Sequence, residues 1–271
     1  MKLTIKDLRF GYNEKDILKK INIQFEPMVT AVIGPNGAGK STLIKCIAGI
    51  LNPKGTIIYN ENKVCSSYRE FYTKVISYFP QTITPNVAIT VFEAVLLGML
   101  NSLSLRVSDE DITKVVDALK DLEIEELAQR RLDELSGGQL QMVSMAQAVI
   151  KEPKVILLDE PLNNLDIHHQ FEILNLICEL TYRRKIITII AMHDLNLAAR
   201  YADRIIVINK GEIYSSGTPA QVLTREMIRS VYMVDAEVSN DCNGIPFVNP
   251  VGLAEGRRLT DKKVINFQRD R

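Results

Sequence analysis

The sequence predicts an α/β fold built around a mostly parallel sheet. One observation is the succession of a short strand, a glycine loop and a helix over residues 29–50. Another is the run of four apolar residues in "KVILLDEP" (154–161), which is typical of a buried parallel strand. Strands and helices continue to alternate over residues 155–208, as right-handed crossover connections require.

Composition excludes several classes of protein. The 271 residues contain 33 basic and 33 acidic side chains, so the basic footprint of most nucleic-acid-binding proteins is missing. The four cysteines (Cys46, Cys65, Cys178 and Cys242) are far apart and form no CxxC pair, which argues against a zinc ribbon or a disulfide framework and fits a reducing cytoplasm. The longest apolar stretch, residues 87–100, is short and contains Glu93. We therefore expect the chain not to cross a membrane by itself.

The glycine loop has the spacing G-x-x-x-x-G-K-[ST] of a phosphate-binding loop. Glycines allow successive backbone N–H groups to face phosphate oxygens, and the start of the following helix adds its positive dipole end. Lys40 can reach the β- and γ-phosphates, and the Ser41 hydroxyl can ligate Mg²⁺. The residues predicted to bind nucleotide here are Gly34, Pro35, Asn36, Gly37, Ala38, Gly39, Lys40, Ser41 and Thr42.

Two carboxylates follow the apolar strand of "KVILLDEP". Because ligands of open α/β sheets bind at the carboxyl ends of strands, Asp159 and Glu160 are expected beside the phosphate loop. Asp159 suits a water-mediated contact to Mg²⁺, and Glu160 suits polarisation of an attacking water. In isolation, a strand that ends in Asp-Glu is more often a turn or a helix cap; the phosphate loop upstream favours the catalytic interpretation.

A third motif, Ser136-Gly137-Gly138-Gln139, precedes a stretch with helical spacing of apolar residues. A serine hydroxyl, glycine amides and a helix N-terminus together form an anion site. With the phosphate loop and the carboxylate strand, this tetrad resembles the signature motif of ATP-binding-cassette (ABC) ATPases. The resemblance extends to about Val234 and implies ATP and Mg²⁺ as ligands. It also implies that the tetrad reaches ATP bound by a second copy of the chain, head to tail.

Further residues match the family pattern, and their roles come from the resemblance. Tyr12 matches the aromatic that stacks on adenine, and Gln81 the glutamine that senses Mg²⁺ and γ-phosphate and links to a membrane subunit. Asp166 ends "NNLD", where the family has a dimer-contact loop, and His193 matches the histidine that bridges γ-phosphate and the catalytic glutamate. Without this context, Tyr12 and His193 would be interpreted as structural. His168 and His169 show no metal-ligand spacing and are expected on a helix surface.

The family implies a P-loop NTPase ABC-cassette fold with a mostly parallel core, an antiparallel β subdomain and an inserted helical subdomain. We predict one ATPase domain over residues 1–234, with the helical subdomain at about residues 84–150. Ser108 and Asp111 resemble a capping box there. One helical face follows and consists of Ile112, Val115, Val116, Leu119 and Leu122. Residues 235–271 are predicted to form a hairpin that turns near Asn243-Gly244, and then a mobile tail.

Leu140 and Met142 depart from the family, in which one or both positions are often polar or basic. Asn163-Asn164 departs from the small residues or Asn-His that are frequent in the dimer loop.

The runs "NNLDIHHQFEILNLI" and "MHDLNLAARYAD" resemble the ATPases of importers for iron-siderophores, haem and cobalamin. This resemblance implies two permease subunits, a substrate-binding protein and a peripheral place at the cytoplasmic membrane face. Two alternatives are a non-transport cassette of translation or DNA repair, and an importer of another cargo such as molybdate. The single cassette, with no long coiled-coil insertion and no basic tail, argues against the first alternative.

Overall fold

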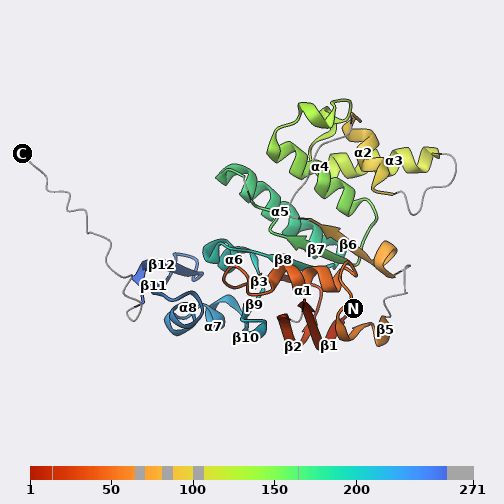
Figure 1. Ribbon diagram of the computed structural model, residues 1–271. Helices are drawn as coiled ribbons and strands as arrows, with labels where there is room; N and C mark the ends of the chain where they lie inside the picture. The colour runs from red at the N-terminus through yellow and green to blue at the C-terminus, as the bar shows by residue number, and fades with distance from the viewer. Residues whose placement is uncertain (14, 65–70, 81–87, 100–106, 164, 255–271) are drawn as a thin grey trace, which may run out of the picture.

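A six-stranded sheet forms the centre of the computed structural model, which describes residues 1–13, 15–64, 71–80, 88–99, 107–163 and 165–254 (Figure 1). In spatial order the strands are β10 (Glu212–Gly217), β9 (Arg204–Asn209), β3 (Val29–Ile33), β8 (Ile187–Ala191), β7 (Val155–Asp159) and β6 (Ile76–Phe79). All neighbours are parallel except β9 and β10. The predicted mostly parallel sheet is confirmed.

The central strands are buried on both faces. Every residue of β3, β7 and β8 is buried. Because successive side chains of a strand point to opposite faces, Ile156 and Leu158 of β7 join one hydrophobic core, whereas Val155 and Leu157 join another. The apolar run in the sequence therefore reflects two covered faces rather than one.

The second core lies between the central sheet and an antiparallel sheet from the N-terminal part of the chain. This sheet has the order β2 (Lys15–Phe25), β1 (Leu3–Tyr12), β4 (Lys54–Tyr59) and β5 (Asn62–Val64). Phe25 and Leu43 are fully buried in the space between the sheets, the latter from helix α1 (Lys40–Ile47). A π-helical turn, Phe71–Val75, precedes β6.

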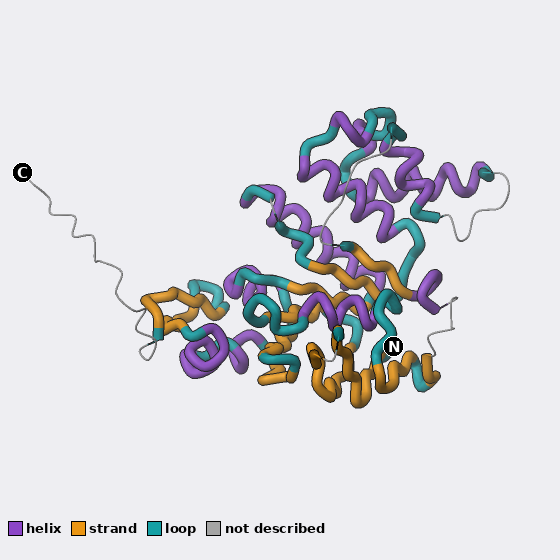
Figure 2. Tube along the Cα trace, viewed as in Figure 1, coloured by secondary structure: helices purple, strands orange, loops and turns teal. Residues whose placement is uncertain are grey.

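The first core is covered by helices, several of which lie above the central strands in Figure 2. Helices α2 (Val91–Leu97), α3 (Asp109–Asp121) and α4 (Gly137–Val149) form one group, linked by the 3₁₀ turns Glu125–Leu127 and Leu132–Glu134. Four further helices also contribute residues to this core: α5 (Ile167–Arg184), α6 (Leu195–Tyr201), α7 (Pro219–Val222) and α8 (Arg225–Tyr232).

Helix α3 begins at the predicted capping box. Ser108 accepts a hydrogen bond from the Asp111 N–H, and the Asp111 carboxylate accepts one from the Ser108 N–H. Within the predicted helical face, Val115 and Leu119 are buried, whereas Ile112 is 42% exposed. Ile112 lies in the first turn of α3, at the end of the buried stripe.

The last described elements are β11 (Val234–Asn240) and β12 (Pro246–Leu253), an antiparallel hairpin whose connection contains Asn243 and Gly244. Asn196 of α6 anchors the hairpin: its amide donates to the Val248 carbonyl at 3.1 Å and accepts from the Val248 N–H at 2.8 Å. In the part of the chain that the structure describes, no helix is long and apolar enough to span a membrane.

Gly34, which follows β3, provides a test of this packing. Its φ of +149° suits glycine, and a Cβ there would lie 2.1 Å from the Ile208 carbonyl oxygen of β9. Gly34→Ala should therefore lower the melting temperature of the nucleotide-free protein. Gly244→Ala is the matched control, because its φ is +76° but no atom lies within 4 Å of a Cβ, so only a backbone cost of about 1–2 kcal/mol applies. Equal melting temperatures for the two variants would contradict the close packing of β3 on β9.

Candidate nucleotide-binding site

The phosphate loop connects β3 to α1 at the carboxyl edge of the central sheet. Gly34, Gly37 and Gly39 have φ values of +149°, +77° and +111°, a region that L-residues with side chains rarely adopt. Gly39 is the N-cap of α1 and makes no side-chain cap, so the first N–H groups of the helix remain available to an external anion. The loop thus has the backbone geometry that its sequence predicts.

Lys40, the first residue of α1, points back into the loop. Its side chain is 4% exposed, and Nζ donates to the carbonyl oxygens of Gly34 at 2.9 Å and of Pro35 at 3.4 Å. Burial lowers the pKa of Lys40, and the nearby carboxylates of Glu160 and Asp159 oppose this shift. Phosphate oxygens carry more negative charge than these carbonyls, so a bound phosphate would be the better partner.

Asp159 ends β7 and is completely buried. Tyr78 donates its hydroxyl to Oδ2 at 3.4 Å, and the Nζ of Lys45 lies 4.0 Å from the same atom. The other oxygen, Oδ1, is buried and has no hydrogen-bond partner of normal geometry among the described residues. Burial raises the pKa of Asp159, while the Ser41 hydroxyl and Lys45 pull this pKa down. An unpartnered carboxylate oxygen close to a serine hydroxyl fits a hard divalent cation such as Mg²⁺.

Glu160 and His193 meet beside this carboxylate. Strands β7 and β8 are parallel neighbours with Asp159 opposite Ala191, so Glu160 and the chain after β8 leave the sheet at the same edge. The Nε2 atom of His193 contacts Oε1 of Glu160, and the Asn163 amide donates to Oε2 at 2.8 Å. Glu160 has a φ of +54°, which costs about 1–3 kcal/mol and fixes the direction of its side chain. A cavity of about 140 Å³ opens beside the pair.

The Ser136 tetrad forms the start of α4. Ser136 caps the helix by accepting from the Gln139 N–H at 3.3 Å, and the Gln139 side chain accepts from the Ser136 N–H at 3.0 Å. A Cβ on Gly137 would meet open space, whereas one on Gly138 would lie 2.6 Å from the His169 ring. The exposed side of the turn is therefore free for an anion, and its other side packs on α5.

The remaining predicted residues lie in different surroundings. Tyr12 ends β1, is 49% exposed and packs edge-on against Phe10 with ring centroids 4.9 Å apart. Asp166 caps α5, where it accepts from the His169 N–H at 3.0 Å. Gln81 and Asn164 lie outside the described residues.

Several contacts at the site were not predicted. Tyr78 and Lys45 both approach Asp159, and Asn163 holds Glu160. Lys45 follows Ser41 by four residues on α1 and so lies on the same helix face, a signal that the sequence contains. Tyr78 comes from β6, and only the pairing of β6 with β7 brings it close to Asp159.

A family model described as "ABC transporter" matches residues 18–163, more than half of the chain. The chain belongs to the ABC transporter family. An uncharacterized ABC transporter ATP-binding protein of Methanocaldococcus jannaschii is 43% identical over 93% of this chain and 99% of its own length. The iron(3+)-hydroxamate import ATP-binding protein of Bacillus subtilis is 34% identical over 88% of this chain and 90% of its own.

Solved structures agree with this assignment. A metal-chelate type ABC transporter in an inward-facing conformation matches with a TM-score of 0.79 and 26% identity, over 93% of this chain and 98% of that chain. A dimeric ABC cassette bound to ADP and Pi after hydrolysis matches with a TM-score of 0.70 and 26% identity. The match covers 80% of this chain and 98% of that chain. This ABC cassette is accordingly an ATPase that binds ATP.

The raised pKa of Asp159 predicts how this ABC cassette responds to pH. The folded chain binds the Asp159 proton more tightly than the unfolded chain, so this contribution to stability is full below the unfolded pKa of about 3.9 and is lost as pH rises through the folded pKa. Asp159→Asn should therefore raise the melting temperature of the nucleotide-free, metal-free protein at pH 7, and by less at pH 4.

Thermal unfolding at the two pH values measures this difference. Asp117→Asn on the exposed side of α3 is the control, and it should shift stability by no more than about 0.5 kcal/mol. A lower melting temperature for Asp159→Asn at pH 7 would show that attraction to Lys40 and Lys45 outweighs the cost of burial.

Proposed function

We propose that this chain is the ATP-hydrolysing subunit of an importer for a metal-chelate compound of the iron-siderophore, haem or cobalamin type. The ATPase part of the proposal rests on the contact of Glu160 with His193. This contact lies beside the buried carboxylate of Asp159, whose Oδ1 has no hydrogen-bond partner among the described residues. The cargo class rests on the relative that imports an iron(3+)-hydroxamate and on the metal-chelate type transporter of similar fold.

The site residues divide the work by their chemistry. Lys40 and the backbone N–H groups of Gly34 and of residues 36–42 bind the phosphates, and Tyr12 presents an exposed ring to the base. Asp159, through water, and Ser41 and Gln81 would hold Mg²⁺, which neutralises phosphate charge when bound. Glu160 accepts the proton of the attacking water, and His193 holds the Glu160 carboxylate in place.

We propose that two copies bind ATP between them. One chain has a phosphate loop at α1 and a separate anion site at the start of α4, in the helical group that Figure 1 draws above the sheet. In a head-to-tail pair, Ser136, Gly137, Gly138 and Gln139 of one copy face the phosphates held by the other, and Asp166 lies at the contact between copies. The dimeric cassette of similar fold supports this arrangement.

The importer needs further subunits. We propose two permease subunits at the cytoplasmic face of the membrane, contacted by Gln81 and by a helical subdomain at about residues 84–150. A substrate-binding protein would deliver the cargo. Residues 1–234 would form the ATPase domain, and residues 235–271 an appendage that begins with the β11–β12 hairpin. Closure on ATP and release after hydrolysis would then drive alternating access.

Glu160→Gln tests the catalytic and dimeric parts of the proposal. The amide keeps the size of the side chain but cannot accept the proton, so hydrolysis should fall by about two to four orders of magnitude while ATP still binds. Sedimentation with Mg-ATP should then show a stable dimer. Glu125→Gln, an exposed change on a 3₁₀ turn, should hydrolyse ATP normally. A Glu160→Gln protein that stays monomeric in Mg-ATP at high concentration would overturn the shared site.

Vesicles that contain the cassette with its cognate permease and binding protein test the transport proposal. ATP-dependent uptake of an iron, haem or corrinoid ligand is expected, and it should vanish in Lys40→Ala because the phosphates lose their buried cation. Lys2→Ala, an exposed lysine outside the helical subdomain, is the matched control with unchanged uptake. Uptake of sugars, amino acids or molybdate, or outward movement, would contradict the cargo class. Failure to co-purify with any membrane subunit would favour a non-transport cassette.

A further inference from the structure

Three potential metal ligands gather at the start of α5, away from the nucleotide-binding carboxylates. One ligand atom from each of His168, His169 and Glu172 lies within 4.8 Å of the other two. Glu172 follows the histidines by four and three residues, the two spacings that bring side chains together on a helix. The expectation that the histidine pair has no partner ligand was therefore wrong, because α5 supplies Glu172 one turn later.

The hydrogen bonds of this cluster are those of a metal-ligating set. Nδ1 of His169 lies 2.8 Å from Oδ2 of Asp166. A ring N–H on Nδ1 donates to this carboxylate, and Nε2 is then the ring atom left for a metal. A carboxylate behind a histidine is the usual second contact of a histidine that binds a metal. Nδ1 of His168 lies 3.4 Å from Oε2 of Glu172.

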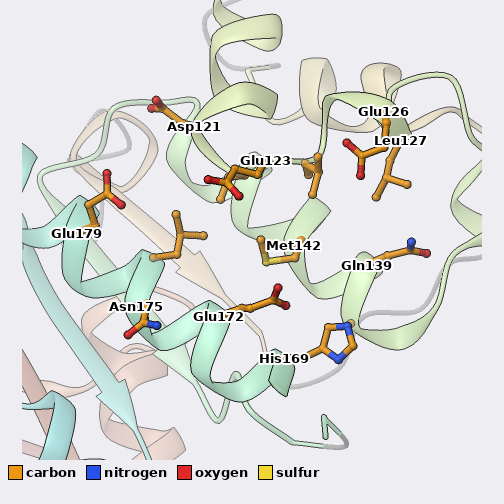
Figure 3. Close-up of a pocket in the computed structure, with 14 residues that line it drawn as sticks. Asp121, Glu123, Glu126, Leu127, Gln139, Met142, His169, Glu172, Asn175 and Glu179 are labelled. Carbon is orange, nitrogen blue, oxygen red and sulfur yellow. The ribbon is translucent and has the colours of Figure 1, made fainter. Parts of the chain in front are cut away.

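The surroundings favour a cation that arrives from solvent. The side chains of His168, His169 and Glu172 are 76%, 36% and 46% exposed. A cavity of about 470 Å³ adjoins His169 and Glu172 between α4, α5 and residues 121–127 (Figure 3). None of the described residues that line it is lysine or arginine, and its acidic members are Asp121, Glu123, Glu126, Glu172 and Glu179.

We propose that His168, His169 and Glu172 form a binding site for one divalent late transition-metal ion, of which Zn²⁺, Ni²⁺ and Cu²⁺ are the candidates. Two imidazoles and one carboxylate suit these ions, whereas Mg²⁺ prefers oxygen ligands alone. Three protein ligands leave at least one coordination position to water. The ion is bound directly by the protein and is distinct from any chelated cargo.

The proposed metal site contacts the turn formed by residues 136–139 but uses none of its residues as ligands. The His169 ring packs closely on Gly138: a Cβ added to Gly138 would lie 2.6 Å from Cδ2 and 2.9 Å from Nε2 of this ring. Asp166, the carboxylate behind His169, caps α5 in the proposed contact between copies. A bound ion would therefore restrain the ring that supports Gly138.

Histidine NMR provides a direct test, because the chain contains only three histidines. The full-length protein, free of nucleotide and with a non-chelating reductant, is titrated with ZnCl₂ while the ring signals are recorded. At one equivalent, two of the three histidines should shift or broaden together. The third signal, assigned by its loss in His193→Ala, should remain. A response of His193 alone, or of no histidine, would overturn the proposal.

Calorimetric titration with Zn²⁺ identifies the ligands. His168→Ala and Glu172→Gln should each weaken binding by at least about tenfold, and Asp166→Asn by about tenfold through loss of the carboxylate behind His169. Cys242→Ser, which removes an exposed thiol, is the matched control and should bind like the parent. His168 is mostly exposed, so its variant should keep the parent melting temperature. Unchanged affinity in both ligand variants, or loss in Cys242→Ser, would exclude the site.

Discussion

The parallel pairing of β7 with β8 is the constraint on which the nucleotide site depends. Because Asp159 pairs with Ala191, the chain leaves both strands at the same edge of the sheet, and Glu160 and His193 come into contact. On the other side of β8, β3 ends at the same edge and delivers the phosphate loop. A shift of register by one residue would exchange the two buried faces of the strand, so the hydrophobic cores themselves hold Glu160 and His193 in place.

Several residues at this edge of the sheet lower the stability of the fold and also form the proposed nucleotide site. Lys40 and Asp159 are buried charges, and Glu160 adopts a positive φ. A buried charge without full compensation is costly, and burial moves the pKa of Lys40 down and that of Asp159 up accordingly. Bound phosphates and a cation would supply the missing partners, so ligand binding should stabilise the domain as a whole.

The sequence predicted those parts of the site that are local in the chain. The glycine loop, the apolar strand with two carboxylates and the serine at the start of α4 each follow from a few adjacent residues. Tyr78 and Gly138 were different: their contacts with Asp159 and His169 depend on strand order and helix packing, which no local pattern contains. Glu172 is an intermediate case, since its spacing from His168 was visible but became meaningful only once α5 was known to be a continuous helix.

Helix α4 connects the helical group to the catalytic loop. At its C-terminal part, the Gln147 amide donates to the Ala94 carbonyl of α2 at 2.7 Å. At its N-terminal part, the Gln141 amide donates to the Pro161 carbonyl, directly after Glu160, and Gly138 rests on the His169 ring. These contacts lie at both ends of one rigid helix, so a displacement of α2 must either break them or move the loop that carries Glu160. Residues 136–139 and Glu160 of one chain are therefore expected to move together, and a force applied to the helical group reaches the Glu160 loop through α4.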